Sequence, residues 1–325
     1  MPLIRNRPLA LAGVFLLLAA LVWLPATPAQ PPNQIRVVLG TATPGGGFQL
    51  FGQHLVEVIN THSTAIQLEE QPTRGSRQNL ALLEQGAIDI GQVEGNAARV
   101  ALEGIGRDPA RLKVLAVMYP NPGLFVVRAD SPYRSIADLK GRPIAFGTRA
   151  SGLRILATDV LDGLGFNPDQ DFEPIILDKA GDGPVLVLEQ KAAALWGAGI
   201  GWPGFVKVAD SDVGARFIAP DAKQIARIRQ KHPHLKPMSV PANTYRGQHK
   251  AIESVGLWSL ILVRPDLAED TVYQLARALH QSESALAERL VQARYTTAQN
   301  TIEQVPPGQL HPGAARYYRE AGLLP

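Results

Sequence analysis

The segment Gln34–Asn60 reads QIRVVLGTATPGGGFQLFGQHLVEVIN. Its first part, Gln34–Thr41, is apolar and β-branched, which predicts a strand. Its last part, Gly47–Asn60, repeats apolar residues near the helical period, which predicts a helix. Between them, the glycines of Gly40–Gly47 allow a tight turn and bring backbone N–H groups close to a ligand. The positive start of the helix suits a carboxylate or phosphate, although a flexible turn without a ligand explains these residues equally well.

The same order of strand and helix continues along the chain and predicts an α/β fold with mainly parallel sheets that are covered on both faces. No repeat at solenoid spacing is present. Further strands are predicted at Ala65–Leu68, Ala87–Val93, Leu112–Met118, Leu124–Val127, Pro143–Phe146, Pro174–Leu177, Ala192–Trp196, Ala215–Ile218 and Ser254–Val263. Further helices are predicted at Ser76–Gln85, Asn96–Glu103, Ser135–Leu139, Ser151–Leu164, Gly183–Gln190, Asp221–Lys231, Asp270–Glu288 and Ala314–Ala321.

Two more polar turns also join a predicted strand to a predicted helix. They are Pro72–Asn79 and Gly147–Gly152. Taken alone, Ser76 is best explained as a simple helix cap. Three such turns together favour a cleft that holds an anionic ligand through backbone amides, at the carboxyl ends of the strands.

Composition excludes several classes of protein. The 325 residues suit about two domains, and the hydrophobic share of 46% is sufficient for a buried core. The chain has no cysteine, so it has no disulfide framework, cysteine metal site, thiol nucleophile or lipid-modified cysteine. We expect no catalytic residues, no cofactor and no bound metal.

Residues 1–29 resemble a secretory signal peptide. Arg5 and Arg7 precede the uncharged apolar run Leu9–Leu24, and small residues follow Pro25. An uncleaved anchor is the alternative, because the run is only slightly short of a membrane span. Either interpretation places the remaining chain outside the cytoplasmic membrane, in the periplasm. Arg5 and Arg7 are the only charges in residues 1–29, so losing them lowers the net charge of +3 by two. The mature chain is nearly neutral, and nucleic acid is not an expected partner.

Several motifs, in this order and spacing, resemble the TAXI-type solute receptors of TRAP transporters over nearly the whole mature chain. The family has a Gly-Gly turn after its first strand, a Gly-Ser-x-x-Asn-Leu helix start, a Leu–Gly–Asp approach to the next strand, an Asp-Leu-Lys-Gly segment and a Thr-Tyr-x-Gly-Gln segment. The matching residues are Leu39–Gly47; Gly75, Ser76, Asn79 and Leu80; Leu83, Gly86 and Asp89; Asp138–Gly141; and Asn243–Gln248.

This resemblance implies a two-lobe, type II-like periplasmic-binding-protein fold with the ligand cleft between its lobes. Lobe I would comprise residues 30–127 and 251–325, and lobe II residues 128–250. The function implied is a monomeric solute receptor that binds a small carboxylate-bearing solute, an amino acid or organic acid, and delivers it to TRAP-type membrane subunits. The alternatives are a receptor for an ATP-driven importer or a sensor kinase, or a secreted hydrolase.

The sequence departs from the family at positions expected to face the ligand. Phe48 and Gln49 stand where many members have two tyrosines, and Ala150–Leu153 stands where Gly-Ser-Gly-Thr is usual. Gln92–Asn96 replaces a segment that often holds Ser-Asp. The residues predicted to bind ligand are Thr43, Gly46, Gly47, Phe48, Gln49, Thr73, Gly75, Ser76, Asn79, Glu94, Asn96, Thr148, Ser151 and Trp202.

Two of these candidates have strong structural alternatives. Glu94 would suit the ammonium group of an amino acid, but an acidic residue is more often a solvated loop side chain. Trp202 could stack on a ligand, but aromatic residues more often pack in a core, which is also the expectation for Trp196 and Trp258.

Other motifs are weaker. Gly199–Gly204 fits the dinucleotide pattern G-x-G-x-x-G, but Pro203 removes an amide where the helix would bind pyrophosphate, so a cleft or hinge loop is the better interpretation. His232 and His234 lack a third ligand at metal spacing in the sequence, which argues against a zinc site. No G-x-S-x-G is present; a hydrolase would need Ser151 beside a histidine or lysine.

Overall fold

The computed structural model describes residues 34–325; the predicted signal peptide or anchor lies outside the described residues. Within them, no helix combines the length and apolarity needed to cross a bilayer. The strands are β1 (Ile35–Gly40), β2 (Ile66–Gln71), β3 (Ile90–Val93), β4 (Lys113–Pro120), β5 (Gly123–Arg128), β6 (Pro143–Thr148), β7 (Glu173–Leu177), β8 (Ala194–Ala198), β9 (Ala215–Ile218), β10 (Lys236–Val240), β11 (Ile252–Gly256) and β12 (Trp258–Val263).

Helices occur throughout the described chain. They are α1 (Gly47–His62), α2 (Ser76–Glu84), α3 (Gly95–Glu103), α4 (Leu153–Leu164), α5 (Asp182–Leu188), α6 (Pro203–Ala209), α7 (Ala222–Lys231), α8 (Glu269–Gln281), α9 (Glu283–Arg289), α10 (Ala298–Gln304) and α11 (Pro312–Glu320). Three short 3-10 helices are η1 (Ala137–Leu139), η2 (Val291–Tyr295) and η3 (Pro307–Gln309).

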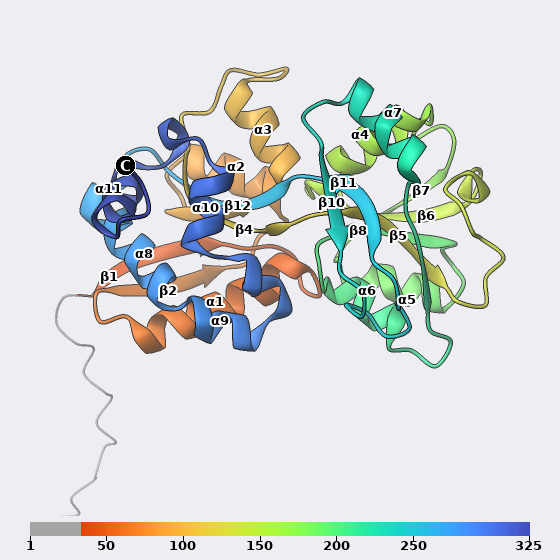
Figure 1. The fold of residues 1–325 in the computed structure, drawn as a ribbon, viewed down its shortest axis with the longest axis horizontal. Helices are drawn as coiled ribbons and strands as arrows, with labels where there is room; N and C mark the ends of the chain where they lie inside the picture. The colour runs from red at the N-terminus through yellow and green to blue at the C-terminus, as the bar shows by residue number, and fades with distance from the viewer. Residues whose placement is uncertain (1–33) are drawn as a thin grey trace, which may run out of the picture. The chain divides into compact units, whose positions relative to one another are not determined.

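Two five-stranded sheets form the frames of two lobes (Figure 1). Sheet I has the order β2-β1-β3-β12-β4, and sheet II has the corresponding order β7-β6-β8-β5-β9. In sheet I, β1 is parallel to β2 and β3, while β12 is antiparallel to β3 and β4. In sheet II, β6 is parallel to β7 and β8, while β5 is antiparallel to β8 and β9. The predicted two-lobe α/β class is confirmed. In each sheet four of the five strands run in the same direction and one is reversed, β12 in sheet I and β5 in sheet II, so the sheets are mixed with mainly parallel strands.

Those reversed strands also correct two details of the sequence interpretation. Leu124–Val127, expected in lobe I, belongs to β5 and pairs in sheet II. The single strand expected at Ser254–Val263 is divided by Leu257 into β11, which pairs with β10, and β12, which pairs in sheet I. Likewise the helix expected at Asp270–Glu288 is divided at Ser282 into α8 and α9. The strand β10 and the helices α6 and α10 were not predicted.

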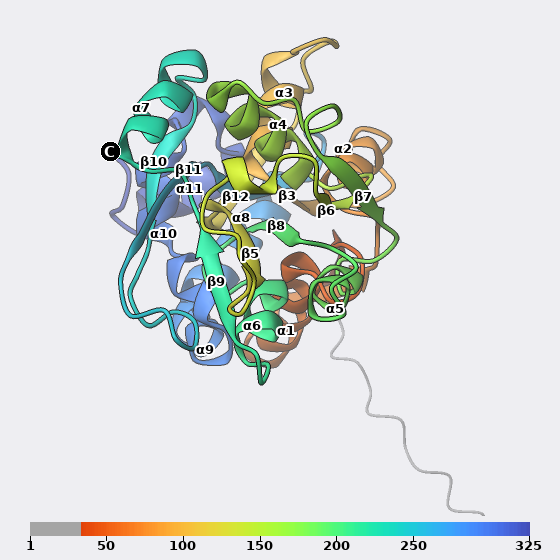
Figure 2. The ribbon, with the colours of Figure 1, turned by 90° about the vertical axis from the view of Figure 1, so that its right-hand side faces the viewer.

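Sheet II is covered on both faces, as its nearly continuous apolar strands require. Helices α4 and α7 lie over one face, and α5 and α6 over the other (Figures 1 and 2). Along β5, Phe125 and Val127 join the core beneath α4 and α7, while Leu124 and Val126 join the core beneath α5 and α6. This alternation is the two-residue period of a strand that is buried on both sides.

The C-terminal helices complete lobe I. Residues from α8 to α11 share one hydrophobic core with β1, β3, β4 and β12. Sheet I therefore depends on both ends of the described chain, whereas lobe II is built from the middle.

Two short connections join the lobes. Asn121–Pro122 links β4 to β5, and Leu257 links β11 to β12. The Asn121 backbone N–H donates to the Leu257 oxygen at 3.0 Å, and the Asn121 Nδ2 donates to the Ser259 Oγ at 2.6 Å. The two connections therefore form one hydrogen-bonded hinge.

Candidate functional site

The loops that follow strands of both sheets meet around one cavity. The strands are β1 to β4 in sheet I and β6 to β8 in sheet II, so the cavity lies at carboxyl strand ends, where α/β sheets bind ligands. Its volume is about 620 Å³ when the open mouth is included. Its wall is formed by Ala42, Thr43, Gly46, Gly47, Phe48, Arg74, Gly75, Ser76, Glu94, Tyr119, Asn121, Gly147, Thr148, Ser151, Gly152, Leu153, Leu177, Ala180, Ala198, Trp202 and Ser259.

Besides α3, which the wall residue Glu94 caps, four helices begin at this wall: α1, α2, α4 and α6. None of the four has a side-chain hydrogen bond at its N-cap or an acidic residue in its first turn. Every other α-helix of the described chain has one or the other: α3, α7, α10 and α11 are capped by a side chain, and α5, α8 and α9 begin with acidic residues. The helix starts with neither a side-chain cap nor a first-turn acid are therefore these four, and the helix dipole there favours an anion. Pro203 has no N–H, so the start of α6 offers fewer donors than the other three.

The first turn meets lobe II directly. The Ala180 N–H donates to the Thr43 Oγ1 at 3.1 Å, and the Gly181 N–H donates to the Pro44 oxygen at 3.2 Å. Gly45 has φ +78°, and a Cβ there would lie 2.5 Å from the Gly181 Cα. Only glycine allows this close approach of two backbones.

The second and third turns meet each other. The Arg77 N–H donates to the Ala150 oxygen at 3.1 Å, and the Thr148 Oγ1 lies 3.4 Å from the Arg74 oxygen. The three turns thus face one cleft, as predicted, and the two lobes are in contact across it.

Glu94 is the acidic side chain of the cavity wall and is 2% exposed. It caps α3 by accepting hydrogen bonds from the backbone N–H groups of Asn96 at 3.0 Å and Ala97 at 3.3 Å, and from the Asn96 Nδ2 at 2.9 Å. Burial raises the pKa of its carboxyl from 4.5 to about 7. The expectation of a solvated loop acid is therefore wrong, because the end of β3 points this side chain into the interface between the lobes.

Aromatic rings supply much of the apolar wall. Trp202 is 5% exposed, lines the cavity and packs edge-on against Phe205, so it serves both the core and the wall. Tyr119 and Phe48 face each other as a T-shaped pair with centroids 6.4 Å apart. Trp196 is a core residue, as expected, and its Nε1 donates to the Leu153 oxygen at 2.9 Å.

Ten of the fourteen residues predicted to bind ligand lie in the cavity wall. They are Thr43, Gly46, Gly47, Phe48, Gly75, Ser76, Glu94, Thr148, Ser151 and Trp202. Ser76 is the first helical residue of α2 rather than its cap; Gly75 holds the cap position, and the Ser76 Oγ accepts the Glu94 N–H at 3.0 Å. Ser76 thereby ties the second turn to the end of β3.

The other four predicted residues lie outside the wall. Gln49 is half-buried in the first turn of α1. The Thr73 Oγ1 accepts the Gly75 N–H at 3.1 Å and so shapes the turn. Asn96 is fully buried and holds the Glu94 carboxylate.

Asn79 has a structural role and does not line the cavity. It is fully buried, and its Nδ2 donates to the backbone oxygens of Gly40, Thr41 and Gln92. It therefore joins the ends of β1 and β3, which carry the first turn and Glu94.

Tyr119, Asn121 and Arg74 belong to the wall but were not predicted. Tyr119 and Asn121 stand at the carboxyl end of β4, so the rule applied to the other strands would have found them. Arg74 lies inside the second turn, and its side chain is the one cationic group among the wall residues.

The Gly199–Gly204 segment is a loop that opens α6 at the cavity, in agreement with the cleft-loop interpretation. Gly199 and Gly201 have φ values of +109° and +71°. Tyr245, whose position was open from the sequence, is buried; its hydroxyl donates to the Gly199 oxygen and accepts the Gly201 N–H, both at 3.0 Å. Tyr245 thus fixes the loop that presents Trp202.

The arrangement expected of a hydrolase is not found in the wall. The Ser151 Oγ accepts the Leu153 N–H at 3.2 Å, and the residues lining the cavity in the described chain include no histidine or lysine.

Two lobes around a hinged cleft define the binding-protein type of α/β fold. The chain belongs to the NMT1-like family, whose model matches residues 39–322. Among solved structures, MatC from Rhodopseudomonas palustris with bound malate is similar at a TM-score of 0.57 and 13% identity, over 88% of this chain and 96% of that one. A periplasmic transporter is similar at 0.56 and 12% identity, over 90% and 94% of the two chains. At such low sequence identities, these similarities show a shared fold only.

Proposed function

We propose that this protein is a monomeric periplasmic solute receptor that closes its two lobes on a small carboxylate-bearing solute, without catalysing a reaction. The observation that carries the proposal is the set of three helix starts, those of α1, α2 and α4, without cap or acid, at one cavity between the lobes. A carboxylate placed there would accept hydrogen bonds from backbone N–H groups of both lobes. A ligand that contacts both lobes only when they meet favours the closed form.

The expected strength of these contacts is sufficient for a receptor. Hydrogen bonds to charged groups contribute about 1.5–3 kcal/mol each. Micromolar binding corresponds to about −8 kcal/mol, so a few such bonds and contact with Phe48, Tyr119 and Trp202 would supply it. Arg74 is an exposed, cationic residue of the wall, and its charge would attract the same class of solute.

Glu94 separates two kinds of solute within this class. As an anion it would pair with the ammonium group of an amino acid, and as a neutral acid its O–H would donate a hydrogen bond to a second carboxylate. Because its pKa is about 7, a dicarboxylate should bind more tightly as the pH falls, and an amino acid more tightly as it rises.

We further propose delivery to TRAP-type membrane subunits, on the basis of the motifs shared with TAXI-type receptors. An ATP-driven importer and a sensor kinase are the alternative partners. The genes adjacent to the gene of this protein would distinguish these three partners, since they would encode TRAP membrane subunits, an ATPase or a kinase.

The ligand class is tested by thermal shift and calorimetry with matched solutes. Malate, succinate and glutamate are compared with their amides and with neutral sugars. A solute at 100 times its dissociation constant should add about 2.7 kcal/mol of stability. Stabilisation by amides or sugars but by none of the carboxylates would contradict the anion-binding site.

A further inference from the structure

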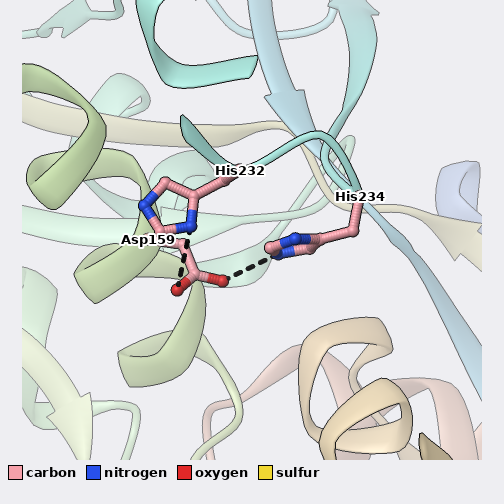
Figure 3. Close-up of side chains that lie close together, drawn as sticks. All are labelled: Asp159, His232 and His234. Atoms are coloured by element: carbon pink, nitrogen blue, oxygen red, sulfur yellow. Dashed lines mark hydrogen bonds and ion pairs between the residues drawn. The ribbon is translucent and has the colours of Figure 1, made fainter. Parts of the chain in front are cut away.

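A cluster of two histidines and an aspartate lies on lobe II, away from the cavity wall. Asp159 is on α4, His232 directly follows α7, and His234 lies before β10 (Figure 3). The sequence shows no third ligand beside the two histidines. The fold supplies one from a residue more than seventy positions earlier, which sequence spacing cannot indicate.

The potential ligand atoms are close to the spacing that a zinc ion requires. The Asp159 carboxylate is 2.9 Å from the His234 Nε2 and 3.7 Å from the His232 Nδ1, and one ligand atom from each residue lies within 4.8 Å of the others. Tetrahedral zinc with bonds of about 2.0–2.1 Å separates its ligands by about 3.3 Å. The two distances lie on either side of that value, so small side-chain rotations would place all three on one ion.

The orientation of His232 suits a metal ligand when its ring is neutral, whereas a protonated ring would form ion pairs with Asp159 and Asp162. Its Nε2 hydrogen-bonds the Asp162 carboxylate at 2.7 Å, which in a neutral ring leaves the Nδ1 as a lone pair. That lone pair faces the Asp159 carboxylate at 3.7 Å, too far for a hydrogen bond. A cation between the His232 Nδ1 and the Asp159 carboxylate would replace the repulsion between these two electron-rich groups with two favourable contacts. Metal-bound histidines commonly donate their other nitrogen to a carboxylate, as His232 does to Asp162.

Access and charge also suit an exchangeable ion. The side chains of Asp159, His232 and His234 are 15%, 17% and 19% exposed, so an ion and a water ligand can reach them. Lys231 pairs with Asp162 at 2.7 Å, and on the facing helix α3 Arg99 pairs with Glu103 at 3.0 Å. Both neighbouring cations thus have their own carboxylates, which leaves Asp159 available to an ion.

We propose that Asp159, His232 and His234 bind one Zn²⁺ ion, with water at the fourth position and Asp162 holding His232 in place. Nitrogen and oxygen ligands of this kind suit zinc among the common divalent cations, whereas Ca²⁺ and Mg²⁺ prefer oxygen alone. The ion would fasten α4, whose start lines the cavity, to the segment that leads into β10.

The test is zinc calorimetry on tag-free, chelator-stripped protein, with cobalt absorbance as a second readout of coordination. We expect one ion per chain. Replacing either histidine by alanine, H232A or H234A, should weaken binding at least about 100-fold, and D162N, outside the ligand set, about 10- to 100-fold. The exposed His249 supplies the control: H249A should bind as the natural protein does.

Circular dichroism of each variant without metal separates lost binding from lost folding. D159N, which preserves volume, gives a further variant if a histidine replacement unfolds lobe II. No binding up to millimolar zinc, or equal binding in H249A and H234A, would overturn the proposal. These measurements use no solute, so they stand or fall separately from the proposed receptor function.

Discussion

Glu94 combines three roles at a single residue. It caps α3, lines the cavity, and stands where Gly152 of the opposite lobe approaches most closely. Its three hydrogen bonds from α3 favour the ionised carboxylate, but the cost of burying the charge is larger, so the net effect raises its pKa to about 7.

The raised pKa of Glu94 predicts a loss of stability with rising pH. Below about pH 4.5 the carboxyl is protonated in both states; between that value and about pH 7 the unfolded chain loses its proton first. The folded state therefore binds more protons in this window, and the free energy of unfolding should fall by on the order of 3 kcal/mol across it. Denaturant unfolding at pH 5, 6, 7 and 8 measures this slope, which should flatten in E94Q. The exposed Glu288 gives the control E288Q, and parallel profiles for E94Q and the natural protein would refute the prediction.

Gly152 is where one added methyl group should prevent closure. A Cβ there would lie 2.6 Å from the Glu94 Cβ and 3.1 Å from the Ser76 Oγ, both in the other lobe. Its φ of −64° suits alanine, so lobe II itself should fold normally. Overpacking of this kind costs about 1–3 kcal/mol, so G152A should weaken solute binding about tenfold or more.

Gly181 provides a matched control for G152A in calorimetry. It also lies between the lobes at the start of a helix, with φ −66°, but a Cβ there would make ordinary contacts of 3.4 Å. G181A should therefore bind like the natural protein. Equal affinity in G152A and G181A would mean that the lobes do not meet in the ligand-bound state as they do in this structure.

At the scale of the element, the starts of α1 and α2 can be tested with one chemical change. Gln49 and Gln78 each occupy the third helical position, and so does Gln224 in α7, far along the chain from the cavity wall. Replacing each glutamine by glutamate adds a charge of nearly equal size and shape. A negative charge in the first turn contributes about 0.3–1 kcal/mol and would compete with an anionic solute.

Q49E and Q78E should therefore weaken carboxylate binding about two- to fivefold, and less so at high salt. Q224E should leave affinity unchanged, although it adds the same charge. Calorimetry at two ionic strengths provides the comparison. If Q49E, Q78E and Q224E all bind the carboxylate with equal affinity, the helix starts contribute nothing to recognition of the solute.

The sequence predicts elements and turns better than it predicts their pairing. Glycines and polar residues after apolar runs mark the three turns, and these signals are local. By contrast, β5 pairs with β8 and β9, and β12 pairs with β3, which all lie far away in the sequence. Local periodicity does not contain such contacts. The same reason explains why the burial of Glu94 was missed: the residues that cover it, such as Gly152, come from the other lobe.

At the scale of the whole molecule, the hinge and the cavity share residues. Asn121 fastens the two connecting segments and also lines the cavity, as does its partner Ser259. A Cβ on Gly256 would lie 1.9 Å from the Asn121 oxygen, so the two connections are packed backbone to backbone. In the proposed mechanism, opening of the lobes would therefore be confined to a small pivot, and closure would bring the turns of both lobes onto the solute together.

The absence of cysteine makes this closure directly testable. A Cβ on Gly46 would lie 3.1 Å from the Ala180 Cβ of the opposite lobe, near the range that a disulfide spans. The double variant G46C/A180C should therefore form a disulfide under mild oxidation and hold the lobes closed, with no native thiol to compete. In X-ray scattering, the oxidised variant should then have the same radius of gyration as the ligand-bound natural protein, smaller than that of the ligand-free natural protein. Solute binding should be blocked until a reductant is added. The single variants G46C and A180C control for the substitutions alone, and thiols that stay free under oxidation, with and without solute, would show that the lobes do not meet at these turns.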